Sequence, residues 1–318
     1  MKITVIGCGR WGSFITWYLD HIGHEVTLYG RESSAHMQRF LKERKNNLLT
    51  LPESVKLTTK LSAVSEGEAI IISVNSQGLQ KLMDELKPMN LSNKKIVLCM
   101  KGIEISTGRR LSQIAEESLN ETNKVAVWLG PGHVQEFTNG IPNCMVIDSR
   151  DEEAKTQLIH AFSGPLIRFY YGQDLIGNEI GAAAKNVIGI AAGMLDGFHL
   201  STLKGALMSR GTREVARLIK AMGGNELSAY GLCHLGDYEA TVFSEFSHNR
   251  RYGELFVQGK ESEGLAEGYY TVKAMVELAK KYNVELPISQ TLYEVFYKGR
   301  EPKEALESLF TRSLKNEF

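Results

Sequence analysis

Residues 3–31 read ITVIGCGRWGSFITWYLDHIGHEVTLYGR, and this stretch decides the fold of the amino-terminal half. It predicts a short buried strand, a glycine turn, an apolar helix and a second strand, in that order. In this context the G-x-G-x-x-G pattern has a mechanism: Gly7 permits the tight turn, Gly9 lets the backbone approach a pyrophosphate, and Gly12 lets the helix press against the strand. The stretch therefore predicts a dinucleotide-binding unit. The alternative is a purely structural glycine turn.

The end of the second predicted strand, at residues 25–29, discriminates between nicotinamide cofactors. An acidic residue there would bind the adenine-ribose 2′-hydroxyl, whereas an arginine accommodates a 2′-phosphate. The next residues are Gly30 and Arg31, so the sequence favours NADP. Glu32 follows directly and keeps NAD open, and a solvated loop charge is the alternative interpretation of Arg31.

Further predicted strands alternate with predicted helices as far as residue 171. This alternation is typical of a parallel, doubly wound sheet. The additional strands are expected at 69–74, 95–100, 124–129, 144–148 and 167–171.

Two of these strands end in polar turns, which are KGIE at 101–104 and GPGH at 130–133. Ligands of doubly wound sheets bind beyond the carboxyl ends of the strands. We therefore expect both turns to lie where a substrate and a nicotinamide would meet. Lys101 is suited to pair with an anionic substrate group, and an exposed loop lysine is the alternative.

The carboxyl-terminal half has a different pattern. From residue 178 the sequence predicts helix after helix, and no strand of comparable strength returns. The predicted fold class is α/β, with a doubly wound Rossmann domain at 1–177 followed by an all-helical domain at 178–318. The predicted helices of the second domain are 179–195, 202–222, 267–282, 288–297 and 302–312.

Residues 179–193, EIGAAAKNVIGIAAG, place Lys185 and Asn186 inside a small and apolar helical run. A buried ammonium loses hydration and is pushed toward its neutral form unless anions compensate, so Lys185 is a candidate proton donor and acceptor. The alternative is a lysine that snorkels from a core helix or closes a structural ion pair with Glu179.

Two polar segments lie between the predicted helices. Asp237 could hold the charge or orientation of Lys185, or accept a hydrogen bond from a substrate hydroxyl. The segment SHNRRYG at 247–253 offers hydroxyl, amide and guanidinium donors that suit a phosphate or a polyol. The alternatives are a helix cap at Asp237 and a charged surface turn at Arg250 and Arg251.

The composition restricts the partners and the compartment. Lys plus Arg and Asp plus Glu both number 37, so no global field recruits nucleic acid or an anionic membrane. The four cysteines have no paired spacing, which favours reduced thiols and argues against a metal site. There is no signal-peptide pattern and no apolar run near the ~20 residues of a membrane span. We expect a cytoplasmic protein that acts on a small molecule.

The sequence resembles bacterial NAD(P)-dependent glycerol-3-phosphate dehydrogenases along nearly its entire length. The resemblance implies a Rossmann domain, a helical domain, and reduction of dihydroxyacetone phosphate to sn-glycerol 3-phosphate for phospholipid synthesis. It is carried by GCGRWG (7–12), LYGR (28–31), KGIE (101–104), GP-x-H (130–133), GAAAKNVIGIAAGMLDG (181–197), RG (210–211), LGD (235–237), S-x-NRRYG (247–253), AEG (266–268) and LPIS (286–289).

Carried over by motif, the resemblance implies that Lys185 is the general acid and base and that Asp237 assists it. The lysine would donate a proton to the forming alkoxide while a reduced nicotinamide supplies hydride. Implied cofactor contacts are Gly7, Gly9, Arg10, Trp11, Gly12, Arg31, Lys101, His248 and Glu267. Implied substrate contacts are Lys101, Gly130, Gly132, Lys185, Asp237, Ser247, His248, Asn249 and Arg250.

Two departures from the family pattern bear on the substrate. Gly132 stands where the family usually has serine, so one hydroxyl contact is missing. His248 stands where the family has an arginine that helps to bind phosphate, and a histidine reaches less far and is only partly charged near neutral pH. Arg250 remains as a substitute cation.

Two other functions remain open from the sequence. One is a related two-domain NADP-dependent dehydrogenase that acts on a different small keto or hydroxy compound. The other is a non-catalytic dinucleotide-binding regulator. A homodimer formed through the helical domain is a further hypothesis.

Overall fold

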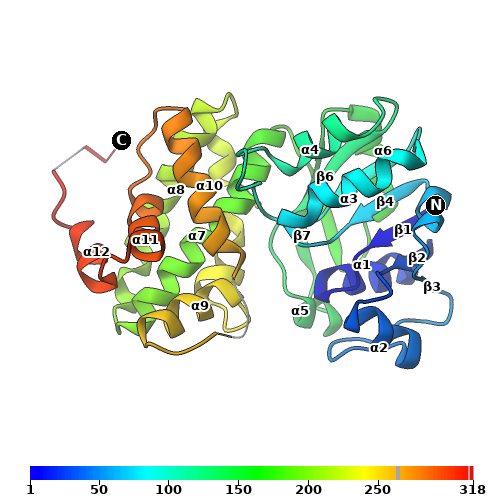
Figure 1. Ribbon diagram of the computed structural model, residues 1–318, viewed down its shortest axis with the longest axis horizontal. Coiled ribbons are helices and arrows are strands. Elements are labelled where there is room, and N and C mark those ends of the chain that lie inside the picture. The colour runs from blue at the N-terminus through cyan, green and yellow to red at the C-terminus, as the bar shows by residue number, and fades with distance from the viewer. Residues whose placement is uncertain (263–265, 314–315, 318) are drawn as a thin grey trace. The chain divides into compact units, whose positions relative to one another are not determined.

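The computed structural model describes residues 1–262, 266–313, 316 and 317, which form two compact units (Figure 1). The first unit comprises Met1–Lys101 and Arg109–Leu175, and the second comprises Gly102–Gly108 and Ile176–Phe318. The sequence places residues 102–108 with the first domain. In the structure they pack with the second unit, because Ile103 is fully buried in that unit's core.

An eight-stranded sheet forms the centre of the first unit. Its strand order is β3-β2-β1-β4-β5-β6-β7-β8, and the first six follow the 3-2-1-4-5-6 order of a doubly wound dinucleotide-binding sheet. The strands are β1 (Lys2–Ile6), β2 (Glu25–Tyr29), β3 (Lys56–Thr58), β4 (Ala69–Ile72), β5 (Lys95–Leu98), β6 (Lys124–Leu129), β7 (Asn143–Ser149) and β8 (Ile167–Tyr171).

Two features of the sheet differ from the sequence-based expectation. The sequence predicts a parallel sheet, but β7 pairs antiparallel to β6, and β8 then pairs parallel to β7. The strand β3 is additional to the expected set, and its residues pair parallel to the end of β2. The predicted doubly wound α/β fold is confirmed, because β1, β2, β4, β5 and β6 are parallel in the order that such folds require.

Helices cover both faces of the sheet. The central strand β4 is completely buried over all four residues, as expected for a parallel strand with a helix layer on each side. Helices α1, α2, α5 and α6 share one core with the sheet, whereas α3 and α4 pack against each other and α4 packs against β5 and β6. These helices are α1 (Arg10–His21), α2 (Ala35–Glu43), α3 (Leu79–Leu86), α4 (Leu111–Ser118), α5 (Val134–Thr138) and α6 (Glu152–Phe162).

The second unit is helical over its described residues. Its core is built mainly from apolar residues of α7, α8, α10 and α11, so the long lysine-bearing helix α7 has neighbours along its length. The elements are α7 (Leu175–Gly197), η4 (Ser201–Leu203), α8 (Lys204–Ala221), η5 (Glu226–Tyr230), η6 (Leu235–Asp237), η7 (Glu239–Phe243), α9 (His248–Val257), α10 (Glu267–Lys281), α11 (Pro287–Lys298) and α12 (Pro302–Ser308).

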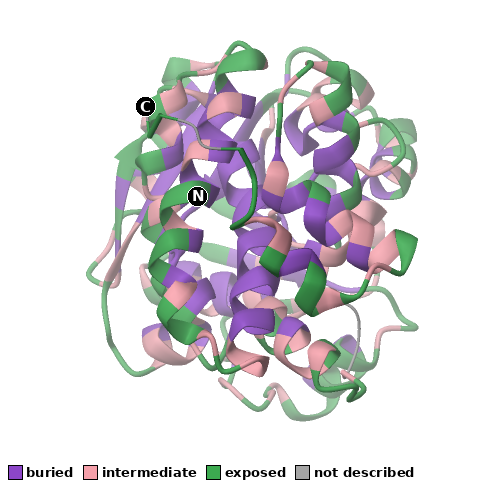
Figure 2. Cartoon of the chain, turned by 90° about the vertical axis from the view of Figure 1, so that its left-hand side faces the viewer, coloured by how far each residue is buried: buried purple, intermediate pink, exposed green. Residues whose placement is uncertain are grey.

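The burial of residues reflects the division of the chain into two units, each with its own core. Figure 2 shows buried residues gathered inside the units and exposed residues on loops and outer helix turns. Every residue from Ile180 to Leu195 is buried, including Lys185 and Asn186. The buried helix predicted for residues 179–195 is therefore present, and it holds a lysine in its interior.

Candidate active site

Lys185 lies near the middle of α7, in contact with two residues of the segment that follows α8. Its Nζ is 2.9 Å from Asp237 Oδ2 and donates a hydrogen bond of 2.7 Å to Thr241 Oγ1. The Lys185 side chain is 10% exposed and the Asp237 side chain 1%. A carboxylate at this distance compensates much of the free energy that burial of an ammonium costs. The structure thus places the two residues named as catalytic candidates in one ion pair.

Two short helical segments position Asp237 and Thr241 beside Lys185. Asp237 ends η6, and Thr241 lies four residues later in η7, a single π-helical turn. The Thr241 hydroxyl donates to the Asp237 main-chain oxygen at 2.7 Å, so its oxygen presents a lone pair to the lysine. Thr241 was not among the residues predicted from the sequence, although its spacing from Asp237 is the helical i, i+4 spacing that puts two residues on one face.

The glycines of α7 allow this close packing. A Cβ atom at Gly189 would lie 2.7 Å from the Thr241 methyl carbon, and one at Gly193 would collide with the main-chain oxygen of Arg250. Gly253 on α9 is the reciprocal case, because a Cβ there would collide with the Ile190 oxygen. Small residues in the lysine helix therefore bring the backbones of η7 and α9 against it.

Asn249 links three helices of this unit. Its Nδ2 donates to Asn186 Oδ1 at 3.1 Å, and its Oδ1 accepts from the Gly268 amide at 2.9 Å. The residue expected to bind substrate thus also connects α7, α9 and the first turn of α10. Glu267, expected to contact the cofactor, begins that same turn.

His234 is a buried neighbour of the lysine pair to which the sequence assigned no role. Its Nδ1 donates to the Gly181 oxygen at 2.8 Å, and its Nε2 accepts from the Tyr238 hydroxyl at 2.8 Å. Burial lowers the pKa of His234 to about 4, against the opposing effects of the Gly181 hydrogen bond and the Asp237 charge. The imidazole is therefore neutral at pH 7 and fixes the backbone on both sides of the site.

Arg250 was expected to substitute for the missing phosphate-binding arginine. In the structure its Nε lies 2.8 Å from Asp196 Oδ2 and its Nη1 lies 3.3 Å from Glu254 Oε2. Asp196 also pairs with Lys204 Nζ at 2.6 Å. Burial alone would raise the pKa of Asp196, but hydrogen bonds from Lys204 and Ser201 and the charges of Lys204 and Arg250 lower it. Two carboxylates thus already hold the Arg250 guanidinium.

Residues 247–253 form the start of a helix, where the sequence left a surface turn as an alternative. The Ser247 side chain caps α9 by accepting from the Arg250 amide, and His248 is the first helical residue. The amide groups of a helix N-terminus attract anions. The segment therefore offers an anion both its polar side chains and the main-chain amides at the start of α9.

The glycine turn of the first unit has the geometry that the motif requires. Gly7 has φ +112°, and a Cβ there would collide with the Ser73 oxygen. A Cβ on Gly12 would collide with the Gly7 oxygen, so the helix lies directly on the turn. A Cβ on Gly9 would face open space, and Gly9 is the residue before α1. This turn can admit a phosphate beside the N-terminus of α1, which fits a dinucleotide.

The other residues predicted to bind the cofactor lie close to this turn in the sequence or on neighbouring strand ends. Arg10 and Trp11 form the first turn of α1, and the Arg10 Nη2 donates to Gln135 at 3.0 Å. Arg31 directly follows β2 and Gly30, and its Nη2 is 3.1 Å from Glu85 Oε1, an exposed pair that leaves the guanidinium accessible. The residues present thus suit either nicotinamide dinucleotide.

The two polar turns after β5 and β6 meet. Lys101 Nζ donates to the Gly130 oxygen at 2.8 Å. Gly132 has φ +143°, a conformation that favours glycine, and a Cβ there would collide with the Phe137 ring. This packing accounts physically for a glycine where the resembling family has serine.

Two kinds of feature are absent from the part of the chain that the structure describes. Among these residues, no cluster of three or more His, Cys, Asp or Glu side chains is arranged to hold a metal ion. In the same residues, no helix combines the length and apolarity needed to cross a membrane.

A doubly wound sheet with a phosphate-type glycine turn, joined to a helical unit with a buried lysine–aspartate pair, defines a class of protein. It is the class of two-domain, dinucleotide-dependent oxidoreductases. Comparison of the sequence with protein-family models identifies the family within this class. The family model described as NAD-dependent glycerol-3-phosphate dehydrogenase N-terminus matches residues 2–155, and the one for the C-terminus matches residues 174–307. The chain belongs to the NAD-dependent glycerol-3-phosphate dehydrogenase family.

Individual relatives agree with the family assignment. A glycerol-3-phosphate dehydrogenase (NAD(P)+) of Fusobacterium nucleatum is 37% identical over 331 residues, covering 100% of this chain and 99% of the relative. Its namesake from a Thermoanaerobacter species is 35% identical over 330 residues with the same coverage. The crystal structure of glycerol-3-phosphate dehydrogenase from Coxiella burnetii superposes with a TM-score of 0.90 at 28% identity, over 98% of this chain and 99% of that one.

Proposed function

We propose that this protein reduces dihydroxyacetone phosphate to sn-glycerol 3-phosphate with NADPH or NADH. The observation that carries the proposal is the buried Lys185–Asp237 ion pair, in a chain whose family and relatives are named for that activity. A proton donor held in a site of low water content is what reduction of a ketone requires of the protein.

Lys185 is the general acid of the proposed reaction. Bound reduced nicotinamide would supply the hydride. The ammonium Nζ of Lys185 donates a proton to the ketone oxygen as negative charge develops there, and in the reverse direction the neutral amine accepts the hydroxyl proton. Asp237 stabilises the ammonium before transfer, and Thr241 fixes its direction through the 2.7 Å hydrogen bond.

The substrate phosphate requires its own anchor. Because Asp196 and Glu254 already hold the guanidinium of Arg250, we assign the anchor to His248 and the N-terminus of α9, with Asn249 beside it. Lys101 supplies a further cation from the turn after β5. Binding energy from the phosphate, remote from the reacting carbon, positions the ketone.

The glycine turn and Arg31 are the proposed cofactor site. Gly7, Gly9 and Gly12 shape the turn for a pyrophosphate, and Arg31 favours the 2′-phosphate of NADP. We further propose that the protein is cytoplasmic, supplies glycerophospholipid synthesis, and forms a homodimer through the helical unit. Sedimentation as a monomer at micromolar concentration would exclude the dimer.

The test is the absorbance of the reduced nicotinamide with dihydroxyacetone phosphate, run with NADPH and NADH in parallel. Lys185→Ala should lower turnover by about 10²–10⁴-fold, the range that general acid catalysis supplies. The matched control is Lys56→Ala, which removes a lysine that is also paired with a carboxylate, at 2.7 Å from Glu25, but is exposed. It should leave turnover unchanged.

Two outcomes would redirect the proposal. If the folded wild type binds NADPH but reduces none of the ketones offered to it, the protein is a dinucleotide-binding regulator. If a ketone without phosphate is reduced as fast as dihydroxyacetone phosphate, the substrate belongs to another class of small keto compounds.

A further inference from the structure

A cavity that the proposed reaction does not use lies within the helical unit. It has a volume of about 980 Å³ and is lined by residues of α7, α8, α11, α12 and the segment after α12. Neither Lys185 nor Asp237 is among its lining residues. Ligand pockets of proteins typically measure about 300–1,000 Å³ and are mostly apolar with a few convergent polar groups. This cavity meets that description.

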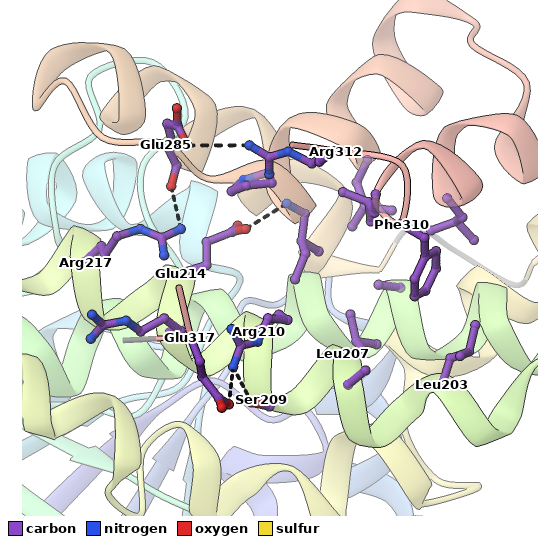
Figure 3. A pocket seen from close by; sticks show the side chains of 18 of the residues that line it. Leu203, Leu207, Ser209, Arg210, Glu214, Arg217, Glu285, Phe310, Arg312 and Glu317 are labelled. Atoms are coloured by element: carbon purple, nitrogen blue, oxygen red, sulfur yellow. Dashed lines mark hydrogen bonds and ion pairs between the residues drawn. The ribbon is translucent and has the colours of Figure 1, made fainter. Parts of the chain in front are cut away.

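Side chains along one face of α8 and the turn before it make one end of the cavity apolar and the other end cationic. Leu203 at the end of η4 and Leu207, Arg210 and Arg217 of α8 line it at the i, i+4, i+7 and i+14 spacing of a single helical stripe. At a rise of 1.5 Å per residue, the stripe extends about 21 Å. It is apolar at the start of the helix and cationic toward its end, as the labelled side chains in Figure 3 show.

Other elements extend both ends of this stripe. Leu306 of α12 and Leu309 and Phe310 after it add apolar lining, and Phe310 lies beside the apolar end of the stripe (Figure 3). Phe310 is 61% exposed, which leaves a large aromatic surface for a ligand to cover. Four arginines line the cavity in total, and they are Arg210, Arg213, Arg217 and Arg312.

The acidic residues of the cavity do not cancel this cationic end. Glu214 is turned to the start of α11, where its oxygens accept from the Ile288 amide at 2.7 Å and the Ser289 amide at 3.0 Å. Glu317 pairs with Arg210 at 2.9 Å, and Glu285 pairs with Arg312 at 3.5 Å.

These two pairs are exposed and exchangeable. The side chains of Glu317 and Glu285 are 67% and 66% exposed. Exposed ion pairs contribute little to stability, because water and salt screen the two charges. A phosphate, which accepts bidentate hydrogen bonds from a guanidinium, would displace them.

We propose that this cavity binds an amphiphile with one alkyl chain and a phosphate headgroup. The chain lies among Leu203, Leu207 and Phe310, and the headgroup replaces Glu317 on Arg210 near the other arginines. Glu317 is then an internal competitor that occupies the headgroup position until a ligand arrives. The inference does not depend on the proposed reaction, because no residue of that reaction takes part.

The test is calorimetric titration of the full-length protein with dodecyl phosphate below its micelle-forming concentration. Arg210→Gln should weaken binding about tenfold, the effect expected for losing one charge-assisted hydrogen bond. Glu317→Gln should tighten binding several-fold, because it removes the competitor. A merely structural role would not move the two variants in opposite directions. The matched control for charge is Arg39→Gln on α2, outside the cavity.

The alkyl chain is tested separately. Phe310→Ser should weaken binding of dodecyl phosphate, whereas Leu41→Ser, at an exposed position of α2, should not. Equal affinity for inorganic phosphate would show a simple anion site and overturn the proposal, as would equal affinity for dodecanol. A change of oligomeric state in Phe310→Ser without any dodecyl phosphate binding to the wild type would assign the surface to a second copy of the chain and also overturn it.

Discussion

Two ion pairs of nearly equal length lie in opposite environments. The Lys185–Asp237 pair spans 2.9 Å with side chains 10% and 1% exposed, whereas the Arg31–Glu85 pair spans 3.1 Å with side chains 51% and 33% exposed. If one partner is lost, water solvates the remaining charge of the exposed pair but not that of the buried pair. The distance between two charges therefore does not decide what an ion pair does. The buried pair fixes a charge in place, and the exposed pair can exchange a partner for a ligand.

The largest expected effect is that of breaking the buried pair. Asp237→Asn leaves the Lys185 ammonium buried without its carboxylate, and should lower the free energy of unfolding by about 3–5 kcal/mol. Urea unfolding at pH 7 measures this loss. Adding Lys185→Met to Asp237→Asn should restore part of it, since the uncompensated charge is gone. A loss below about 1 kcal/mol would mean that water reaches the lysine and the comparison fails.

A pH test of the same region comes next. The folded-state pKa of His234 is about 4, below the ordinary value of 6.5. Between these pH values the unfolded chain binds the proton and the folded chain does not, so stability falls as pH falls. The full loss is roughly 3 kcal/mol. The groups that face the ring are Tyr238, the Gly181 oxygen, Asp237 and Lys185.

The measurement is the pH dependence of urea unfolding in wild type and His234→Gln. The variant should lose the fall in stability that wild type shows from pH 6.5 toward pH 4. The exposed His36→Gln on α2 is the control and should keep it. Identical curves for all three proteins would contradict the assignment of a neutral, buried imidazole.

Asp196 forms ion pairs whose burial is intermediate between those of the two pairs above. It pairs with Lys204 at 2.6 Å and with Arg250 at 2.8 Å, and its side chain is 11% exposed. Asp196→Asn should cost about 2 kcal/mol, because it removes the charged partner of both Lys204 and Arg250, while Arg250 keeps Glu254 and Lys204 keeps its hydrogen bond to the Val242 oxygen. The lowered pKa of Asp196 gives the sign of the pH dependence: this stability is present above the ordinary carboxyl pKa and is lost as pH falls through the lowered value. Unfolding at pH 7 and pH 3 compares the two states.

The smallest stability effect should come from the exposed pair. Arg31→Gln should change the free energy of unfolding by less than about 0.5 kcal/mol. It should nevertheless lower the preference for NADPH over NADH about tenfold, because the 2′-phosphate loses a charged partner. Kinetics with both cofactors measure the ratio, and Glu85→Gln is the reciprocal variant, which frees Arg31 and should raise the preference. An unchanged ratio in both variants would leave Arg31 as a solvated loop charge.

Much of the fold follows from the sequence because strands and helices alternate with clear hydrophobic periods. The direction of β7 does not follow, since a buried strand has the same pattern whether it runs parallel or antiparallel. The strand β3 was missed because Lys56–Thr58 is three residues long and has one apolar side chain. Helix α9 was missed because its first residues are polar and form no apolar period until the helix is under way.

The site was predictable where chemistry is concentrated in one residue type. Lys185 stands out in the sequence because it lies among alanines and glycines. Asp237, an aspartate in a polar segment, is a natural partner for it. Thr241 and His234 were not assigned because their roles come from contacts made in the folded unit, at 2.7 and 2.8 Å, and not from a local pattern. The ion pair between Arg250 and Asp196 is likewise a tertiary contact between residues far apart in the sequence.

The assignment of residues 102–108 to the helical unit has a consequence for how the gene can be divided. The chain passes from one unit to the other at 101/102, 108/109 and 175/176. A fragment that ends at residue 175 therefore carries Ile103, a fully buried residue, away from the core that covers it. The complementary fragment lacks that residue and leaves a gap in its own interior. The two halves are thus not interchangeable modules, and exchange between related proteins should succeed only when residues 102–108 travel with the helical unit.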